Sequence, residues 1–152
     1  MLKIGVCDTT FARANMAKWV LEEITDKAKI VRYTVPGIKD LPVACLKLFK
    51  EDKCDLVIAL GMPGGAPIDT QCAHEASLGI QAVQLQTAKH VLEVFVHEGE
   101  SKDERELLKI CVNRARKHAR NALKLLEGKT ALTLLAGQGL RQGREDAGKL
   151  RC

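Results

Sequence analysis

Aromatic side chains are scarce in this chain, which has one Trp, one Tyr and three Phe among 152 residues. A core of this size must therefore be built almost entirely from aliphatic side chains. Long apolar runs are also missing, since none approaches the roughly 20 residues that a helix needs to cross a bilayer. The chain enters a strand-like pattern directly after Met1-Leu2, without a signal peptide. These absences predict a cytoplasmic protein with no membrane partner.

Several ligand-binding motifs are absent as well. The glycine-rich segment 61–67 lacks the Lys-Ser/Thr of a P-loop, and segment 8–13 contains no G-x-G-x-x-G. This argues against nucleoside triphosphates and NAD as ligands. His74-Glu75 and His97-Glu98 are adjacent pairs without a second helical histidine, so the motif of a zinc hydrolase is missing. Side-chain spacing therefore predicts no firm metal site.

The cysteines form no recognisable framework. No C-x-x-C pair and no close Cys/His set occurs. Free cysteines pack as small hydrophobic residues in proteins of a reducing compartment. We therefore predict six reduced thiols, most of them buried: Cys7, Cys45, Cys54, Cys72, Cys111 and Cys152.

What the chain does contain is 46% hydrophobic and 28% charged residues, with an uneven charge distribution. Such a composition and length predict one globular domain. Residues 1–108 carry 13 Lys/Arg and 16 Asp/Glu, a net charge of −3, whereas residues 109–152 carry 11 and 3, a net charge of +8. A basic segment of this kind is typical of a nucleic-acid contact or of a face that meets an acidic face of another subunit. Subunit docking is the simpler explanation, and we expect no nucleic-acid partner.

Short apolar runs alternate with longer helical patterns along the chain. Strands are expected at 3–7, 29–35, 55–60 and 90–96. The first two helices are expected at about 15–27 and 41–52. The third is expected to begin after an N-cap at Asp69 or Thr70, and the fourth to run from a capping box at Ser101 and Glu104 to about Glu127. Four strand-then-helix units predict a single three-layer α/β domain, a four-stranded parallel sheet with helices on both faces. This domain covers residues 1–128, and the Gly-rich basic tail 129–152 either docks or stays mobile.

Ligands of open parallel sheets bind beyond the carboxyl ends of the strands. That rule selects the loops 8–13, 36–40, 61–67 and 97–100. A single aromatic, Phe11, stands there and is able to stack on a flat heterocycle. Asp40 offers an acceptor for sugar-alcohol hydroxyls, while Lys39 or His97 offers donors. Close backbone approach to ring edges is expected at four residues: Gly37, Ile38, Gly61 and Met62. A flat, polar, neutral ligand suits this set.

Five blocks in chain order closely resemble archaeal-type riboflavin synthase, a family that is itself similar to lumazine synthase. They are DTTFAR (8–13), VPGIKDLPVA (35–44), ALGMPG (59–64), CAHEASLG (72–79) and EVFVHE (93–98). The resemblance covers about residues 1–127, and GQGLRQG (137–143) in the tail also looks like the family. It implies a lumazine synthase-like fold and a homopentamer with active sites between neighbouring subunits.

The resemblance also implies a transferase of riboflavin biosynthesis. Two molecules of 6,7-dimethyl-8-ribityllumazine give riboflavin and 5-amino-6-(D-ribitylamino)uracil by transfer of a four-carbon unit. Turnover is expected to be helped by a divalent cation, magnesium or manganese, with no nucleotide or flavin prosthetic group. The reaction begins with loss of a proton from the 7-methyl group, and His74 or His97 is expected to assist this step. The expected substrate-binding residues are Thr10, Phe11, Ala12, Pro36, Gly37, Ile38, Lys39, Asp40, Gly61, Met62, Pro63 and Phe95.

Two other functions stay open. A lumazine synthase would carry a proton-handling His and a phosphate-binding Arg, but an ungapped comparison puts Ile68 and Pro63 at those positions. The nearest imidazole is His74, and Arg114 or Arg116 stands as a substitute for the arginine. The other alternative is a non-catalytic flavin- or RNA-binding module that uses the basic segment.

Overall fold

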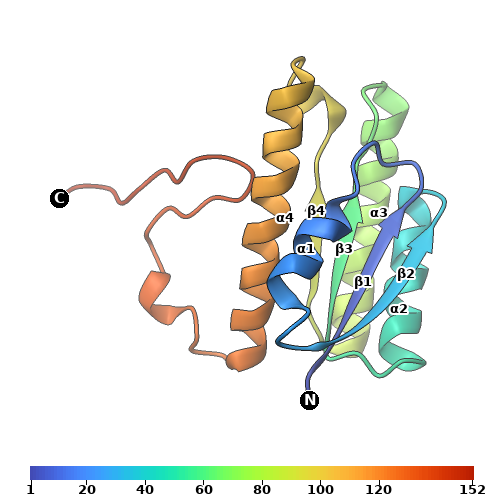
Figure 1. The fold of residues 1–152 in the computed structure, drawn as a ribbon, viewed down its shortest axis with the longest axis vertical. Coiled ribbons are helices and arrows are strands. Elements are labelled where there is room, and N and C mark those ends of the chain that lie inside the picture. The colour runs from blue at the N-terminus through green and yellow to red at the C-terminus, as the bar shows by residue number, and fades with distance from the viewer.

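The computed structural model describes residues 1–152, and four strands alternate with four helices along them (Figure 1). The strands are β1 (Lys3–Thr9), β2 (Lys29–Val35), β3 (Leu56–Gly61) and β4 (Val91–Phe95). The helices are α1 (Met16–Ile24), α2 (Leu41–Lys50), α3 (Pro67–Thr87) and α4 (Glu104–Glu127). Three single-turn 3-10 helices complete the chain: η1 (Ile38–Asp40), η2 (Glu98–Glu100) and η3 (Thr133–Leu135).

The strands form one parallel sheet in the order β2-β1-β3-β4. Ile4 of β1 is registered with Ile30 of β2 on one side and Leu56 of β3 on the other. Every residue of β3 is buried, as its continuous apolar run predicts. The strand order reverses between β1 and β3, so the loops that follow these two strands diverge and leave a crevice at their carboxyl ends. The predicted four-stranded parallel sheet is confirmed.

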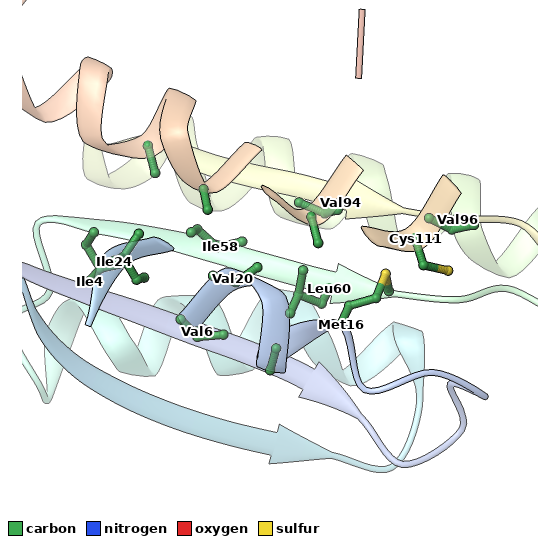
Figure 2. Packing of buried hydrophobic residues seen from close by; sticks show 14 of the residues in the cluster. Ile4, Val6, Met16, Val20, Ile24, Ile58, Leu60, Val94, Val96 and Cys111 are labelled. Carbon is green, nitrogen blue, oxygen red and sulfur yellow. The ribbon is translucent and has the colours of Figure 1, made fainter. Parts of the chain in front are cut away.

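Helices cover both faces of the sheet and create two aliphatic cores. Alternate side chains of each strand point to opposite faces, so Ile58 packs under α1 and α4 while its neighbour Val57 packs under α2 and α3. Burial of an aliphatic side chain of this size stabilises a fold by about 1.5–3 kcal/mol. Figure 2 shows the first core, where strand residues meet one face of α1: Ile4, Val6, Ile58, Leu60, Met16, Val20 and Ile24.

Several predicted boundaries and both predicted caps are wrong. β1 continues to Thr9, because the Asp8 carboxylate accepts hydrogen bonds from Arg32 and Thr34 and extends the pairing with β2. The third helix begins at Pro67, and Asp69 accepts from the Ala66 N–H instead of acting as the N-cap. The N-cap of α4 is Asp103, whose side chain accepts from the Arg105 N–H, so the expected capping box does not form. Smaller shifts affect the ends of α1, α2, β3 and β4.

The tail docks in part on α4 of its own chain. The Gly143 N–H donates to Asn113 Oδ1 at 2.8 Å, and Lys117 Nζ donates to the carbonyls of Arg141 and Arg144 at 2.8 and 3.2 Å. The segment between α4 and these contacts projects away from the body (Figure 1). Of the two predicted behaviours, docking is therefore observed for residues 141–144.

The basic residues of α4 are largely compensated inside the chain. Arg116 and Arg120 both pair with Glu23 of α1, and Arg114 pairs with Glu100. The net charge of +8 thus includes cations that hold α4 against the acidic end of α1, a use that the charge count alone did not reveal. No helix combines the length and the apolarity needed to span a membrane.

All six cysteines are free thiols, and four of them are buried. Cys7 and Cys45 lie side by side with their sulfur atoms 3.4 Å apart. That contact, together with burial, holds the pKa of Cys7 well above its usual value. The predicted burial of most cysteines is confirmed.

Candidate functional site

Two pockets open at the carboxyl end of the sheet, with α3 between them. The Phe11 pocket has a volume of about 240 Å³ and lies over β1 and β3; it is lined by Thr9, Phe11, Gly37, Ile38, Lys39, Asp40, Met62, Pro63, Asp69 and Cys72. The edge pocket has a volume of about 510 Å³ and lies beside β4; it is lined by Thr70, Ala73, His74, Ser77, Glu93, Phe95, His97, Arg114, His118 and Gln142.

Backbone hydrogen bonds to the end of β2 present Phe11 to its pocket. The Thr10 N–H donates to the Val35 carbonyl at 2.9 Å, and the Phe11 N–H donates to the Pro36 carbonyl at 3.2 Å. The Phe11 side chain itself stays 56% exposed. An aromatic ring held open above a pocket, in a chain with so few aromatics, provides a stacking surface for a flat ring.

The loop after β2 supplies polar groups to the same pocket. The Gly37 N–H donates to Asp40 Oδ2 at 3.0 Å, which fixes the carboxylate and leaves its other oxygen available to a ligand. Lys39 Nζ lies 2.7 Å from Glu75 Oε2 of α3. This ion pair raises the pKa of Lys39 and lowers that of Glu75. Asp40 is therefore the freer hydrogen-bonding group.

Gly61 brings β3 and β4 close together beneath the pockets. A Cβ on Gly61 would lie 2.8 Å from Phe95 Cε1, so the Phe95 ring packs directly over this glycine. Phe95 consequently lines the edge pocket and not the Phe11 pocket. Met62 and Pro63, the next residues along the chain, are buried and form the base of the Phe11 pocket.

Arg114 is the only arginine of the edge pocket, and four of the five N–H groups of its guanidinium are hydrogen-bonded within the chain. Nη1 donates to the Phe95 carbonyl and to Glu100 Oε2, Nη2 donates to Glu100 Oε1, and Nε donates to the Gln142 carbonyl, at 2.7–3.2 Å. Burial opposes ionisation of Glu100, but the hydrogen bonds from Arg114 outweigh it and keep the pKa of Glu100 below its usual value. The side chain of Arg114 is only 15% exposed.

The tail passes over Arg114 at Gly143. This glycine has a φ of +86°, and a Cβ there would lie 2.3 Å from the Arg114 Nε. Only glycine combines that backbone conformation with such a close approach. The tail thus completes one wall of the edge pocket.

Burial shifts the pKa of two further groups of the edge pocket, His118 and Glu93. Burial lowers the pKa of His118 to about 4, with the charge of Arg114 as a second cause, and its buried Nδ1 has no hydrogen-bond partner. Burial raises the pKa of Glu93, against the opposing effects of a hydrogen bond from the Ser77 hydroxyl and of nearby His97. His74 on α3 is exposed, and His97 after β4 is half-buried.

The structure divides the predicted site residues into two groups. The Phe11 pocket gathers Phe11, Gly37, Ile38, Lys39, Asp40, Met62 and Pro63, and the edge pocket gathers His74, His97 and Phe95. Four predicted binding residues line neither pocket within one chain: Thr10, Ala12, Pro36 and Gly61.

Sequence reasoning missed most of the edge pocket. Glu93, Ser77 and His118 are absent from the predicted set. One signal was present, because Glu93 is the single charged residue of β4. Its significance depends on β4 being an edge strand next to α3, which the sequence does not specify.

The divalent cation that the resemblance implies would need side chains able to bind it. No three His, Cys, Asp or Glu side chains come together in a way that could hold a metal ion. The residues therefore do not fit a divalent cation that is bound by protein ligands alone.

Comparison with known proteins adds an independent finding. The family model described as 6,7-dimethyl-8-ribityllumazine synthase matches residues 1–130. A riboflavin synthase of Methanothermobacter thermautotrophicus is 54% identical over 99% of this chain and 100% of its own length. Riboflavin synthases of Archaeoglobus fulgidus and Aeropyrum pernix are 48% and 46% identical, over 98% and 97% of this chain and 99% and 97% of their own lengths. The matches to these relatives extend over the tail, whereas the family model ends at residue 130.

Proposed function

The chain belongs to the 6,7-dimethyl-8-ribityllumazine synthase family, in the branch of archaeal riboflavin synthases, and from that membership we infer that it catalyses the riboflavin synthase reaction. One molecule of 6,7-dimethyl-8-ribityllumazine transfers a four-carbon unit to a second, which yields riboflavin and 5-amino-6-(D-ribitylamino)uracil. The enzyme is a transferase of riboflavin biosynthesis.

The hydrogen bonding of Arg114 favours riboflavin synthase over lumazine synthase, the two activities of this family. A lumazine synthase must bind a phosphorylated four-carbon substrate, whereas neither substrate molecule of riboflavin synthase contains phosphate. Arg114 is the only arginine of the edge pocket, and Glu100 neutralises it through two hydrogen bonds. Ile68 is 61% exposed at the start of α3 and supplies no imidazole. These features support a neutral, unphosphorylated substrate.

We propose that the Phe11 pocket holds one lumazine. Phe11 stacks on the ring, Met62 and Pro63 form the surface beneath it, and the free oxygen of Asp40 accepts from a ribityl hydroxyl. Holding two rings in register is worth roughly 7–11 kcal/mol of the barrier in favourable cases. The 7-methyl group is already acidified by the ring, so positioning and a modest base supply most of the required catalysis.

We further propose that the active site lies between copies of the chain in a homopentamer. Both pockets are open, and α3 separates them within one chain. The edge pocket of one copy would then close over the Phe11 pocket of the next. The six free thiols support a reducing, cytoplasmic location. Activation by magnesium or manganese remains a proposal, and its test is turnover with each ion and with EDTA.

One assay tests the function. The protein is incubated with 6,7-dimethyl-8-ribityllumazine alone, with and without magnesium, and riboflavin fluorescence is recorded. Formation of riboflavin and the aminouracil in equal amounts is expected. Absence of riboflavin in both conditions contradicts the proposal. Two further incubations then apply: dihydroxybutanone phosphate with the aminouracil reports lumazine synthase activity, and salt-dependent retention of RNA reports a binding module.

A further inference from the structure

Glu93 is a half-buried strand carboxylate without a cationic partner, whereas Asp40 is exposed in a loop and Glu100 is paired with Arg114. Glu93 lies on β4 between the buried residues Val91 and Val94, faces α3, and lines the edge pocket together with Phe95. No Lys or Arg forms an ion pair with it, because the only arginine of the pocket is bound to Glu100. A half-buried carboxylate without a cationic partner is costly to keep ionised, so it is well suited to accept a proton.

Ser77 fixes the orientation of this carboxylate. The Ser77 hydroxyl donates a hydrogen bond to Glu93 Oε1, and Oε2 has no partner in the chain. The two imidazoles predicted from the sequence lack such support, since neither the His74 ring nor the His97 ring makes a hydrogen bond. An acid-base group acts efficiently when its own orientation is held by its surroundings. Glu93 satisfies this requirement and the histidines do not.

We propose that Glu93 is the base that removes the proton from the 7-methyl group of the lumazine, and that Ser77 is its positioning residue. This inference rests on the proposed function. The methyl C–H bond breaks, its electron pair stays on carbon and is delocalised into the ring, and the proton forms an O–H bond with Glu93 Oε2. The resulting carbanion attacks the second lumazine. Loss of the proton from Glu93 to water regenerates the carboxylate.

The groups that face Glu93 set its behaviour with pH. Ser77 and His74 face it from α3, His97 from the end of β4, and Arg114 and His118 from α4. Burial raises the pKa of Glu93, while Ser77 and His97 lower it. Activity should therefore fall on the acid side as Glu93 becomes protonated. Loss of the Ser77 hydrogen bond should move this acid limb to higher pH.

Exchange of the 7-methyl protons tests the proposal on one substrate molecule, before any carbon bond forms. The protein is mixed with 6,7-dimethyl-8-ribityllumazine in D2O, and loss of the methyl proton signal is followed by NMR against a protein-free sample. Glu93→Gln should reduce both the protein-dependent exchange and kcat by about 10²- to 10⁴-fold, with KM changed less than about threefold. Ser77→Ala should reduce both by about fivefold and shift the acid limb upward. Glu51→Gln, an exposed site on the far end of α2, serves as the matched control.

The outcomes separate this proposal from the function itself. Wild-type protein that forms no riboflavin contradicts the proposed function. Wild-type protein that forms riboflavin, while Glu93→Gln exchanges methyl protons at the normal rate, overturns the role of Glu93 alone. A raised KM with normal exchange would make Glu93 a binding residue and would likewise overturn the proposal. Unchanged thermal unfolding of Glu93→Gln shows that the variant folds, as expected because Gln keeps an acceptor for Ser77.

Discussion

The two pockets of this chain lie at the same end of one sheet, yet their chemistry differs. The Phe11 pocket is the smaller and is built from an aromatic ring, an apolar base and loop backbone, with its lysine already paired. The edge pocket is twice as large and contains two hydrophobic residues among ten, together with three imidazoles and Glu93. One pocket is suited to hold a flat ring and the other to move a proton.

Position in the sheet explains the difference. The Phe11 pocket lies over β1 and β3, where each strand has a neighbour on both sides and the diverging loops leave a crevice with an apolar base of Met62 and Pro63. The edge pocket lies beside β4, which has no partner strand on its outer side. A sheet edge tolerates polar and charged side chains that a central strand excludes. In the proposed homopentamer, the two environments come together from two copies of the chain.

The largest effect is expected from mixing two damaged chains. Phe11→Ala impairs one pocket and Glu93→Gln the other, so each protein alone has little activity at a substrate concentration well below KM. If each site combines pockets of neighbouring copies, random co-assembly restores about a quarter of the sites, since each pocket is intact with a probability of one half. Co-expressed variants should show this recovery in riboflavin formation. Activity no higher than that of the separate variants would place each site within a single chain.

Phe11→Ala alone should lower kcat/KM by about 10- to 100-fold. Loss of ring stacking costs about 0.5–1.5 kcal/mol beyond the buried area, and the area itself contributes further. The change should fall on KM, in contrast to Glu93→Gln, which acts on kcat. Steady-state kinetics measures both. Phe11→Tyr should retain activity, and Leu134→Ala, exposed in the tail, is the control for a lost surface side chain. A drop confined to kcat would contradict the assignment of Phe11.

Acid should lower the free energy of unfolding through His118, which lines the edge pocket. The Phe11 pocket contains no histidine. The pKa of His118 is lowered to about 4 in the fold, so between about pH 6.5 and 4 the unfolded chain binds a proton that the folded chain does not. Stability is then lost as the pH falls through this window, by on the order of 2 kcal/mol for this group. Urea unfolding at several pH values should show a flatter dependence for His118→Leu. His90→Leu, at the exposed start of β4, should keep the wild-type slope.

Gly143→Ala should release the wall that the tail adds to the edge pocket. The new Cβ overlaps Arg114, so the segment 139–146 detaches and trypsin cuts at Arg141 and Arg144 about tenfold faster. Gly148→Ala is the matched control, because Gly148 has a similar φ of +79° and no atom within 4 Å of the added Cβ. Equal cleavage of both variants would show that backbone strain alone loosens the tail.

Periodicity predicted the elements well because β3 and α4 carry strong patterns of their own. The ends of those elements depend on single contacts between side chains that are far apart in the sequence, such as the hydrogen bond between Asp8 and Arg32. The Phe11 pocket was predictable, since its residues follow strand ends and topology brings such loops together. Glu93 was not, because its role depends on strand order and on which residue of α3 faces it.

The distribution of thiols gives this protein a built-in set of chemical reporters. Cys111 lies in the core under α1 and α4, Cys7, Cys45 and Cys54 lie in the core under α2 and α3, and Cys72 lines the Phe11 pocket. Only Cys152 is fully open to an alkylating reagent. The order in which the native protein becomes alkylated would therefore record the opening of each layer separately. Protection of Cys72 by riboflavin would report occupancy of the Phe11 pocket without any added label.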